Sequence, residues 1–181
     1  MGANNAQTIT YKGNKEWATV QYIDQTDNNS VIKTDTVNGV YGQTVSYDAT
    51  DEIKALESEG YQLVSDGVKN DQITLTDGTN QVYQVVLKHA TRTDTPTSNP
   101  DSLPSDDLQK TVSETINYVY GKDAGSLAGK QAADSVTKTV TFTRSATVDQ
   151  VTHKVISYGS WTPATGEYPE VSSPEVTGYT P

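Results

Sequence analysis

Few residues in this chain could carry out acid–base or nucleophilic chemistry. Two histidines occur, His89 and His153, and each stands beside a lysine within or at the end of an expected strand. No cysteine occurs, which excludes disulfides, thiolate nucleophiles and cysteine metal sites. A Ser-His-Asp triad needs a histidine oriented by a third group, and nothing in the sequence marks a nucleophile elbow. We therefore expect two exposed strand-end histidines and no enzyme.

Oxygen ligands for a metal ion gather in the polar stretch after the first expected strand. Asp24, Asp27, Asn28 and Asn29 could offer hard oxygen ligands to calcium. Their spacing lacks the EF-hand pattern, so an ordinary hairpin turn is the simpler interpretation. No cofactor is expected apart from this weak calcium candidate.

Flat amphipathic rings are better candidates for a function, as contacts to sugars or proteins. Such rings stack on apolar sugar faces and dominate interface hot spots. The candidates are Tyr41, Tyr47, Tyr118, Tyr120, Tyr158 and Trp161. Half or more are expected in a core, and Tyr118 and Tyr120 in particular lie on an expected inward face. Tyr41, Tyr47, Tyr158 and Trp161 remain as ligand-binding candidates.

A row of threonines in the second half could exchange hydrogen bonds with glycans. Residues 135–144 (SVTKTVTFTR) alternate strictly between apolar and polar side chains, which predicts a half-buried strand. Its polar face carries Thr137, Thr139, Thr141 and Thr143. A solvated sheet face that resists edge aggregation is the simpler interpretation.

Composition favours sheet and excludes two classes of partner. Only 33% of the 181 residues are hydrophobic, with one Phe and 11 Tyr, so the cores must use Val, Ile, Leu and tyrosine rings. Thr and Val are β-branched and suit a pleated surface. A net charge of -10 repels nucleic acid and anionic membranes, which attract clustered Lys and Arg. No apolar run approaches the ~18 residues that span a membrane.

Residues 91–104 (TRTDTPTSNPDSLP) form the clearest boundary, because three prolines stiffen this stretch and interrupt the apolar alternation. The sequence therefore predicts two domains, residues 14–90 and residues 105–181, with residues 91–104 as a linker. We expect an elongated arrangement.

The first segment predicts a mixed sheet with one helix. Residues 16–24 alternate as a strand, and residues 31–40 form its hairpin partner. Residues 48–60 predict the helix, with Asp48 as the cap and Gly60 beyond its end. Strands follow at 61–65 and 81–88, with turn signals at Asp66-Gly67 and Asp77-Gly78. The order ββαββ is that of a β-grasp domain, although other α+β folds share it.

The second segment predicts a mostly β domain. Strands are expected over 108–120, 135–144 and 147–157, with a loop or short helix over 121–134. Extended chain with four prolines follows from residue 162.

Ordered motifs in both segments resemble the mucus-binding protein repeats of lactobacilli and related Gram-positive bacteria. In the first segment they are residues 22–24 (YID), the glycines 39 and 42 with Tyr47, residues 60–66 (GYQLVSD) and residues 82–89 (VYQVVLKH). In the second they are residues 136–144 (VTKTVTFTR), 158–163 (YGSWTP) and 178–181 (GYTP). The resemblance covers nearly the whole chain after about residue 14.

The resemblance implies a two-domain unit repeated many times in a large, cell-wall-anchored adhesin, with an N-terminal ubiquitin-like β-grasp domain and a β-rich companion. It implies mucin glycoproteins and their glycans as partners, then immunoglobulins outside the antigen site and neighbouring repeats of the parent chain. It assigns no ligand-binding residue. Residues 103–106 (LPSD) match only the start of a wall-sorting motif, so the signal peptide and anchor are expected elsewhere in the parent chain.

Three functions stay open at this point. The first is adhesion to mucin glycans, with weak single sites strengthened by tandem copies. The second is immunoglobulin recognition, for which residues 31–40 could act as a free sheet edge. The third is a stalk or spacer with no ligand of its own, which the proline-rich junction favours.

Overall fold

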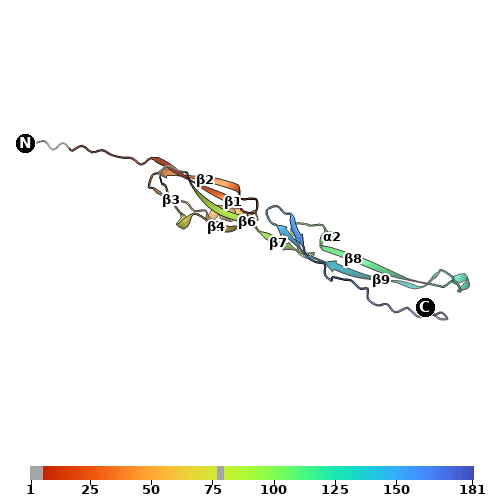
Figure 1. Ribbon diagram of the computed structural model, residues 1–181. Helices are drawn as coiled ribbons and strands as arrows, with labels where there is room; N and C mark the ends of the chain where they lie inside the picture. The colour runs from red at the N-terminus through yellow and green to blue at the C-terminus, as the bar shows by residue number, and fades with distance from the viewer. Residues whose placement is uncertain (1–5, 77–79) are drawn as a thin grey trace, which may run out of the picture. The chain divides into compact units, whose positions relative to one another are not determined.

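The computed structural model describes residues 6–76 and 80–181 (Figure 1). The chain divides into two compact units. The first contains the residues up to Thr91 together with Asp149–Lys154, and the second contains Arg92–Val148 and Val155–Pro181. Within the described residues, no helix is long and apolar enough to cross a membrane. The turn expected at Asp77-Gly78 lies outside them.

A four-stranded sheet in the order β2-β1-β6-β4 is the frame of the first unit. Its strands are β1 (Lys15–Asp24), β2 (Ser30–Val40), β4 (Tyr61–Asp66) and β6 (Gln81–His89). β1 pairs antiparallel with β2 and parallel with β6, and β4 pairs antiparallel with β6. The expected alternation is confirmed, because Ala18, Val20 and Tyr22 of β1 are fully buried.

One helix and a small second sheet complete this unit. The helix α1 (Thr50–Ser58) confirms that a helix lies within residues 48–60. The expected cap is wrong, because the N-cap is Ala49, and Asp48 before it accepts a hydrogen bond from the N–H of Thr50 at 2.8 Å. Ile53 and Leu56 of α1 are buried. The strands β3 (Thr44–Ser46) and β5 (Gln72–Thr74) pair antiparallel, and the 3₁₀ helix η1 (Lys69–Asp71) precedes β5.

The core of the first unit is formed by the sheet, α1 and the loops between them. Its buried members are Ala18, Val20, Tyr22, Val37, Ala49, Ile53, Leu56, Val68, Ile73, Leu75, Val85 and Leu87. Burial of each Val, Ile or Leu side chain contributes about 1.5–3 kcal/mol, so the aliphatic residues supply most of the stabilisation despite the low apolar content.

Apart from Thr91 and Asp149, which belong to the first unit, a three-stranded sheet in the order β11-β10-β7 lies in the second unit. Its strands are β7 (Thr91–Asp94), β10 (Ala146–Asp149) and β11 (Val155–Tyr158). The helix α2 (Ser105–Leu108) precedes a long ribbon, and Leu108, Ala146 and Val148 form a small core. Residues 91–104, expected as a linker, thus begin with an edge strand, and their prolines follow it.

The single strand expected over 147–157 is wrong, because a hairpin occupies this stretch. β10 pairs antiparallel with β11, and the chain reverses between them. Asp149 makes the turn, since its Oδ1 accepts the backbone N–H groups of Val151 and Thr152, both at 2.9 Å. His153 has a positive φ of 57°. Side-chain hydrogen bonds of this kind give the backbone an alternative to continuing the strand.

The ribbon consists of β8 (Gln109–Val119) and β9 (Gln131–Thr143), paired antiparallel, with the 3₁₀ helix η2 (Gly125–Leu127) in the connecting loop. Thr111 and Thr141 face each other, as do Thr115 and Thr137, with hydroxyl oxygens 3.1 Å apart in both pairs. These pairs form the threonine face that the alternation predicts.

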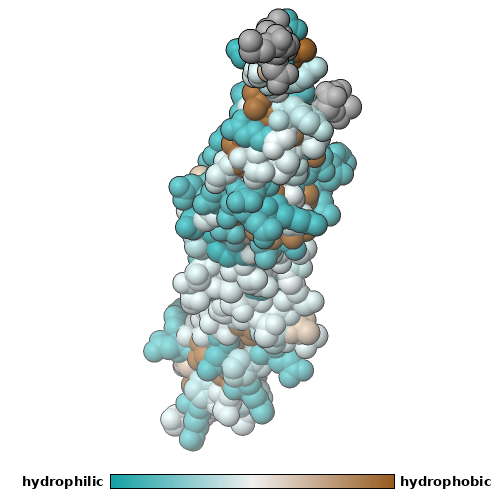
Figure 2. Space-filling model, turned by 90° about the vertical axis from the view of Figure 1, so that its left-hand side faces the viewer, coloured by the Kyte–Doolittle hydropathy of each residue, from teal (hydrophilic) through white to brown (hydrophobic). Residues whose placement is uncertain are grey.

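The C-terminal tail lies along the apolar face of the ribbon, beside β9 in Figure 1. An added Cβ at Gly166 would be 2.5 Å from the ring of Phe142 and 2.8 Å from a methyl of Val140. Glycine is therefore needed at this close approach. On the face shown in Figure 2, apolar residues occur as small separate spots on a hydrophilic surface.

Candidate ligand-binding site

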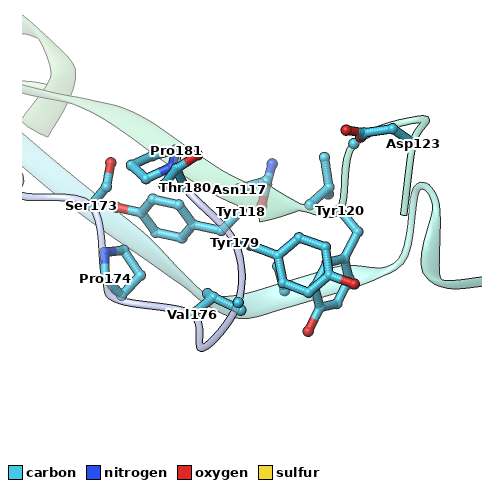
Figure 3. Close-up of a pocket in the computed structure, with 14 residues that line it drawn as sticks. Asn117, Tyr118, Tyr120, Asp123, Ser173, Pro174, Val176, Tyr179, Thr180 and Pro181 are labelled. Atoms are coloured by element: carbon cyan, nitrogen blue, oxygen red, sulfur yellow. The ribbon is translucent and has the colours of Figure 1, made fainter. Parts of the chain in front are cut away.

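A pocket of about 510 Å³ lies where the C-terminal tail meets the end of the ribbon (Figure 3). One side is formed by the end of β8 and the loop that follows it, and the other by residues 173–181 of the tail. Three tyrosines, Tyr118, Tyr120 and Tyr179, line it together with hydroxyl, amide and carboxylate side chains. Concave sites that combine apolar surface with a few polar groups are typical of ligand binding.

The ribbon fixes the first part of this pocket. The N–H of Tyr120 donates to the carbonyl of Lys130, and the carbonyl of Tyr120 accepts from the N–H of Gly129, both at 2.9 Å. These bonds close the end of the ribbon and hold Tyr120 in place. Tyr118 is near the end of β8, Tyr120 directly follows that strand, and both line the pocket.

A tight turn in the tail places Tyr179 opposite the ribbon. The N–H of Tyr179 donates to the carbonyl of Val176 at 2.9 Å, and Gly178 has a φ of 84°, in the region that favours glycine. The rings of Tyr179 and Tyr120 meet edge to face, with centroids 4.8 Å apart and an angle of 65° (Figure 3). Tyr179 remains 44% exposed, so its ring is accessible to a ligand.

Polar groups surround the three rings. Asn117 accepts a hydrogen bond from the hydroxyl of Ser135 at 2.7 Å, which orients its amide. Ser173 and Thr180 contribute hydroxyls. Among the described residues that line the pocket, Asp123 is the only charged one. This arrangement can hold an uncharged, hydroxyl-rich ligand by stacking and hydrogen bonding.

The candidates Tyr158 and Trp161 come together elsewhere in the second unit, around Arg144. The guanidinium carbon of Arg144 is 3.8 Å from the ring centroid of Tyr158 and 4.5 Å from that of Trp161. Lys110 lies 5.2 Å from the centroid of Trp161. The Tyr158 hydroxyl donates to Asp107 at 3.1 Å, and burial together with this bond raises the pKa of Tyr158. Arg144 and Lys110 therefore contact these rings as cation–π partners.

The candidates of the first unit have separate roles. The hydroxyl of Tyr47 donates to Oδ2 of Asp35 at 2.6 Å, and the Tyr47 ring packs against the core. Tyr41 follows β2 and is 57% exposed.

The threonine candidates lie on the ribbon of the second unit, apart from the pocket lining. Thr137, Thr139 and Thr141 are exposed on the threonine face, whereas Thr143 is half-buried. The backbone of Thr143 pairs with that of Thr162. The structure does not assemble the eight predicted binding residues into one site.

The pocket contains residues that sequence reasoning assigned differently. Tyr118 and Tyr120 were expected to be inward-facing core residues, yet they are half-buried and line the pocket. Tyr179 was not a binding candidate, although it belongs to the motif of residues 178–181 (GYTP) and follows a glycine that permits a turn.

His89 corrects the expectation of exposed histidines, because its side chain is only 9% exposed and lies between Asp24 and Asp149. His153 is exposed, as expected.

The four calcium candidates form a hairpin turn. Oδ1 of Asp24 accepts the N–H groups of Thr26 and Asp27, while its Oδ2 faces His89. Asn28 and Asn29 have positive φ values of 51° and 59°, as a tight hairpin requires. Across the described part of the chain, no group of three or more His, Asp or Glu side chains is arranged to hold a metal ion.

Comparisons with known proteins agree with this two-part organisation. The model of the mucin binding domain family matches residues 16–89, and the model of the Muc B2-like domain family matches residues 104–181. A comparison with curated proteins finds no match.

Two solved structures are similar over most of the chain. The type 2 repeat of the mucus binding protein MUB from Lactobacillus reuteri is 31% identical, with 91% of this chain and 85% of that chain covered and a TM-score of 0.59. The crystal structure of Mub-RV is 32% identical, with 91% and 84% covered and a TM-score of 0.66. Identity of this level over nearly a whole solved repeat, with both domain models in order, shows that the chain belongs to the family of mucus-binding protein repeats.

Proposed function

We propose that this repeat is a non-enzymatic module of a bacterial cell-surface adhesin, and that it binds host mucin through a glycan held in the pocket of Figure 3. Membership of the mucus-binding repeat family supports the class of ligand. The single observation that supports the place of binding is the pair of accessible rings, Tyr120 and Tyr179, beside Tyr118 and several polar groups. Sugars present an apolar face to such rings and hydroxyls to such polar groups.

The charge of the pocket favours uncharged sugars. Asp123 is the only charged side chain among its described lining residues, and the whole chain carries a net charge of -10. A sialic acid or sulfate group would meet repulsion without a compensating Lys or Arg. We therefore expect terminal galactose or N-acetylhexosamine units to bind more tightly than their sialylated or sulfated forms.

Substitution of the pocket tyrosines tests this proposal. Tyr179→Ala and Tyr120→Ala should each weaken binding of immobilised mucin by about tenfold, because the loss of one aromatic contact at a hot spot costs roughly 1–2 kcal/mol. Tyr11→Ala is the matched control, since Tyr11 is 89% exposed in the N-terminal segment. Surface plasmon resonance on native and desialylated mucin provides the measurement. Full binding by both pocket variants would refute the site, and tighter binding to sialylated mucin would refute the sugar class.

Tandem repetition and wall anchoring are part of the same proposal. A shallow pocket gives weak binding for one repeat, and linkage to neighbouring repeats raises the effective concentration of sites. We infer that the parent chain anchors the array to the cell wall of a Gram-positive bacterium. An array that bound mucin no better than one repeat would contradict the avidity mechanism.

Immunoglobulin is a second candidate partner, and the sheet order supports it. β2, which contains the segment 31–40, is an edge strand of the four-stranded sheet and could accept an additional strand. Enzymatic removal of mucin glycans should abolish mucin adhesion and leave binding of antibody fragments intact. If neither ligand binds, the repeat is a stalk module.

We also infer that the first unit is a ubiquitin-like β-grasp domain. The order β2-β1-β6-β4, with its parallel central pair and the single helix α1, supports this fold. The antiparallel pair β1 and β2 precedes α1, and the antiparallel pair β4 and β6 follows it. This is the order ββαββ that the sequence predicts.

A further inference from the structure

The ring of His89, at the end of β6, lies between two carboxylates that are distant in the sequence. Nδ1 is 2.6 Å from Oδ2 of Asp149, and Nε2 is 2.8 Å from Oδ2 of Asp24. The side chains of Asp24 and Asp149 are 5% and 13% exposed. All three residues belong to the first compact unit, which includes the loop Asp149–Lys154. The proposed glycan pocket uses none of them.

Both carboxylates also accept backbone hydrogen bonds. Oδ1 of Asp24 accepts the N–H groups of Thr26 at 2.8 Å and of Asp27 at 3.2 Å. Oδ1 of Asp149 accepts two N–H groups of its own turn. Burial alone would raise the pKa of Asp149, but the N–H of Thr152 and the His89 ring outweigh it, so this pKa is lowered.

The number of N–H donors that the two carboxylates require then indicates the protonation state of the imidazole ring. An ionised carboxylate can only accept hydrogen bonds, so each Oδ2 needs a donor. A neutral imidazole has one N–H and one lone pair, and one of its nitrogens would face a carboxylate oxygen without a proton. Only the doubly protonated ring makes both bonds. With both carboxylates ionised, the imidazolium is therefore the form of the ring that satisfies both contacts.

The other neighbours of the ring agree with this state. Tyr61 of β4 meets it edge to face, with centroids 5.5 Å apart. Burial raises the pKa of Tyr61, followed by the negative charges of Asp24, Glu59, Asp149 and Asp27, so the phenol stays neutral. The groups that face His89 in the described structure are thus carboxylates and one neutral phenol.

The contact between His89 and Asp149 attaches the loop Asp149–Lys154 together with hydrogen bonds from Gln150. Asp149 begins the loop Asp149–Lys154, and Gln150 attaches it to the chain beyond β6 through its N–H, which donates to the carbonyl of Ala90 at 2.9 Å. The Gln150 side chain donates to the carbonyl of Thr91 at 3.1 Å. Two hydrogen bonds from Gln150, the close packing of Gln150 against Gly60 and the contact between His89 and Asp149 therefore all attach this loop.

We propose that His89 is a proton-dependent latch, which ties the loop Asp149–Lys154 to the ends of β1 and β6 while the ring is doubly protonated, and loosens that loop when the ring loses a proton. The loop does not leave entirely, because the bonds from Gln150 to Ala90 and Thr91 involve no titrating group.

The pH range follows from the direction of the shifts. Burial lowers the pKa of His89, but the bonds to Asp149 and Asp24 outweigh it and raise the pKa above its ordinary value of 6.5. The latch is therefore complete below pH 6.5 and is lost as pH rises through the raised value. At the acidic end, the bond between His89 and Asp149 persists below the ordinary pKa of 3.8 for an aspartate, because the pKa of Asp149 is lowered.

Nuclear magnetic resonance on the whole 181-residue chain tests the latch directly. A pH titration with ¹⁵N-labelled histidine should show both ring nitrogens of His89 protonated at pH 6.5 and a midpoint above that of an ordinary histidine. A single-protonated ring at pH 6.5, or a midpoint at or below the ordinary value, would overturn the proposal. This measurement needs no variant.

Hydrogen exchange tests the effect on the loop. At a pH above the His89 midpoint, the amides of Val151 and Thr152 should exchange about tenfold faster than at pH 6, after correction for intrinsic rates, because one charge-assisted bond is lost. His89→Gln should show fast exchange at both pH values, whereas His153→Gln, the control on the same loop, should retain the pH step. A step that survives in His89→Gln, or disappears in His153→Gln, would refute the latch.

Discussion

At the scale of single residues, Tyr47 shows how hydroxyls organise the interior of the first unit. Its hydroxyl donates to Asp35, so its single hydrogen is used, and the hydroxyl of Tyr22 at 3.0 Å must donate to it. Lys33 lies 3.8 Å from Oδ1 of Asp35 and balances its charge. Burial raises the pKa of Tyr22 and Tyr47, which keeps both phenols neutral. The hydrogen bond donated by Tyr22 therefore depends on Tyr47, and the hydrogen bond donated by Tyr47 depends on Asp35.

Tyr47→Phe should therefore lower the free energy of unfolding by about 1 kcal/mol, because a half-buried hydrogen-bonded hydroxyl is lost and Tyr22 is left without its acceptor. Tyr41→Phe is the control, with an expected change below about 0.5 kcal/mol for an exposed position. Urea unfolding followed by tyrosine fluorescence measures both. Equal stability of the two variants would show that the hydroxyl chain contributes nothing.

At the scale of elements, Gly60 ends the turn after α1 in a conformation that only glycine adopts easily. Its φ is 101°, and an added Cβ would lie 2.5 Å from the carbonyl carbon and oxygen of Gln150. Backbone atoms cannot move aside as a flexible side chain can. The end of α1 and the loop Asp149–Lys154 are thus packed without room for a methyl group.

Gly60→Ala should destabilise the chain by about 2–3 kcal/mol, through both backbone strain and this clash. Gly42→Ala separates the two causes, because Gly42 has a φ of 78° but nothing lies within 4 Å of an added Cβ. Gly42→Ala should lower the free energy of unfolding by about 1 kcal/mol. Thermal unfolding by differential scanning calorimetry gives the comparison, and a Gly60 variant no worse than the Gly42 variant would disprove the close contact.

Elements with a strong local pattern were predictable. β1 alternates from Lys15 to Tyr22 with one face buried, and α1 has acidic residues in its first turn and ends before Gly60, so short-range rules suffice for both. The hairpin of β10 and β11 was not predictable in this way. Its turn contains neither glycine nor proline and depends on hydrogen bonds from Asp149 to Val151 and Thr152.

The sites were less predictable than the elements, because they depend on long-range contacts. From the sequence, His89 is expected to be exposed at the end of a strand. In the structure its ring is covered by Asp149, which is 60 residues away in the sequence. Tyr120 becomes part of a pocket only when the tail brings Tyr179 to it. Tyr158 and Trp161 were separate candidates in the sequence, and no local pattern indicated that the Arg144 guanidinium contacts both rings.

At the scale of the whole molecule, the net charge of -10 sets how the repeat approaches mucin. Long-range repulsion from anionic glycoproteins is screened by salt, since the Debye length falls to about 8 Å at physiological ionic strength. Binding through uncharged sugars involves no attraction between opposite charges, so added salt cannot weaken it by screening. Electrostatics should therefore oppose the encounter and leave the bound contacts unchanged.

Raising NaCl from about 20 to 150 mM should consequently increase the association rate with native mucin and leave the dissociation rate unchanged. Desialylated mucin is the matched control, because its lower charge should make the association rate less sensitive to salt. Stopped-flow or surface plasmon resonance kinetics measure both. Binding that weakens steadily with added salt would point to a cationic contact and contradict the neutral-sugar assignment.

The parallel pairing of β1 with β6 has a mechanical consequence. Along the chain, these are the first and last strands of the four-stranded sheet, although they lie side by side at its centre. Their paired residues run from Ala18 opposite Gln81 to Asp24 opposite Leu87. Tension between the start of β1 and the end of β6 slides the two strands along each other in opposite directions. Their hydrogen bonds then share the load and must rupture together, instead of opening one after another from an end. A module built in this way keeps its fold when flow pulls on the chain.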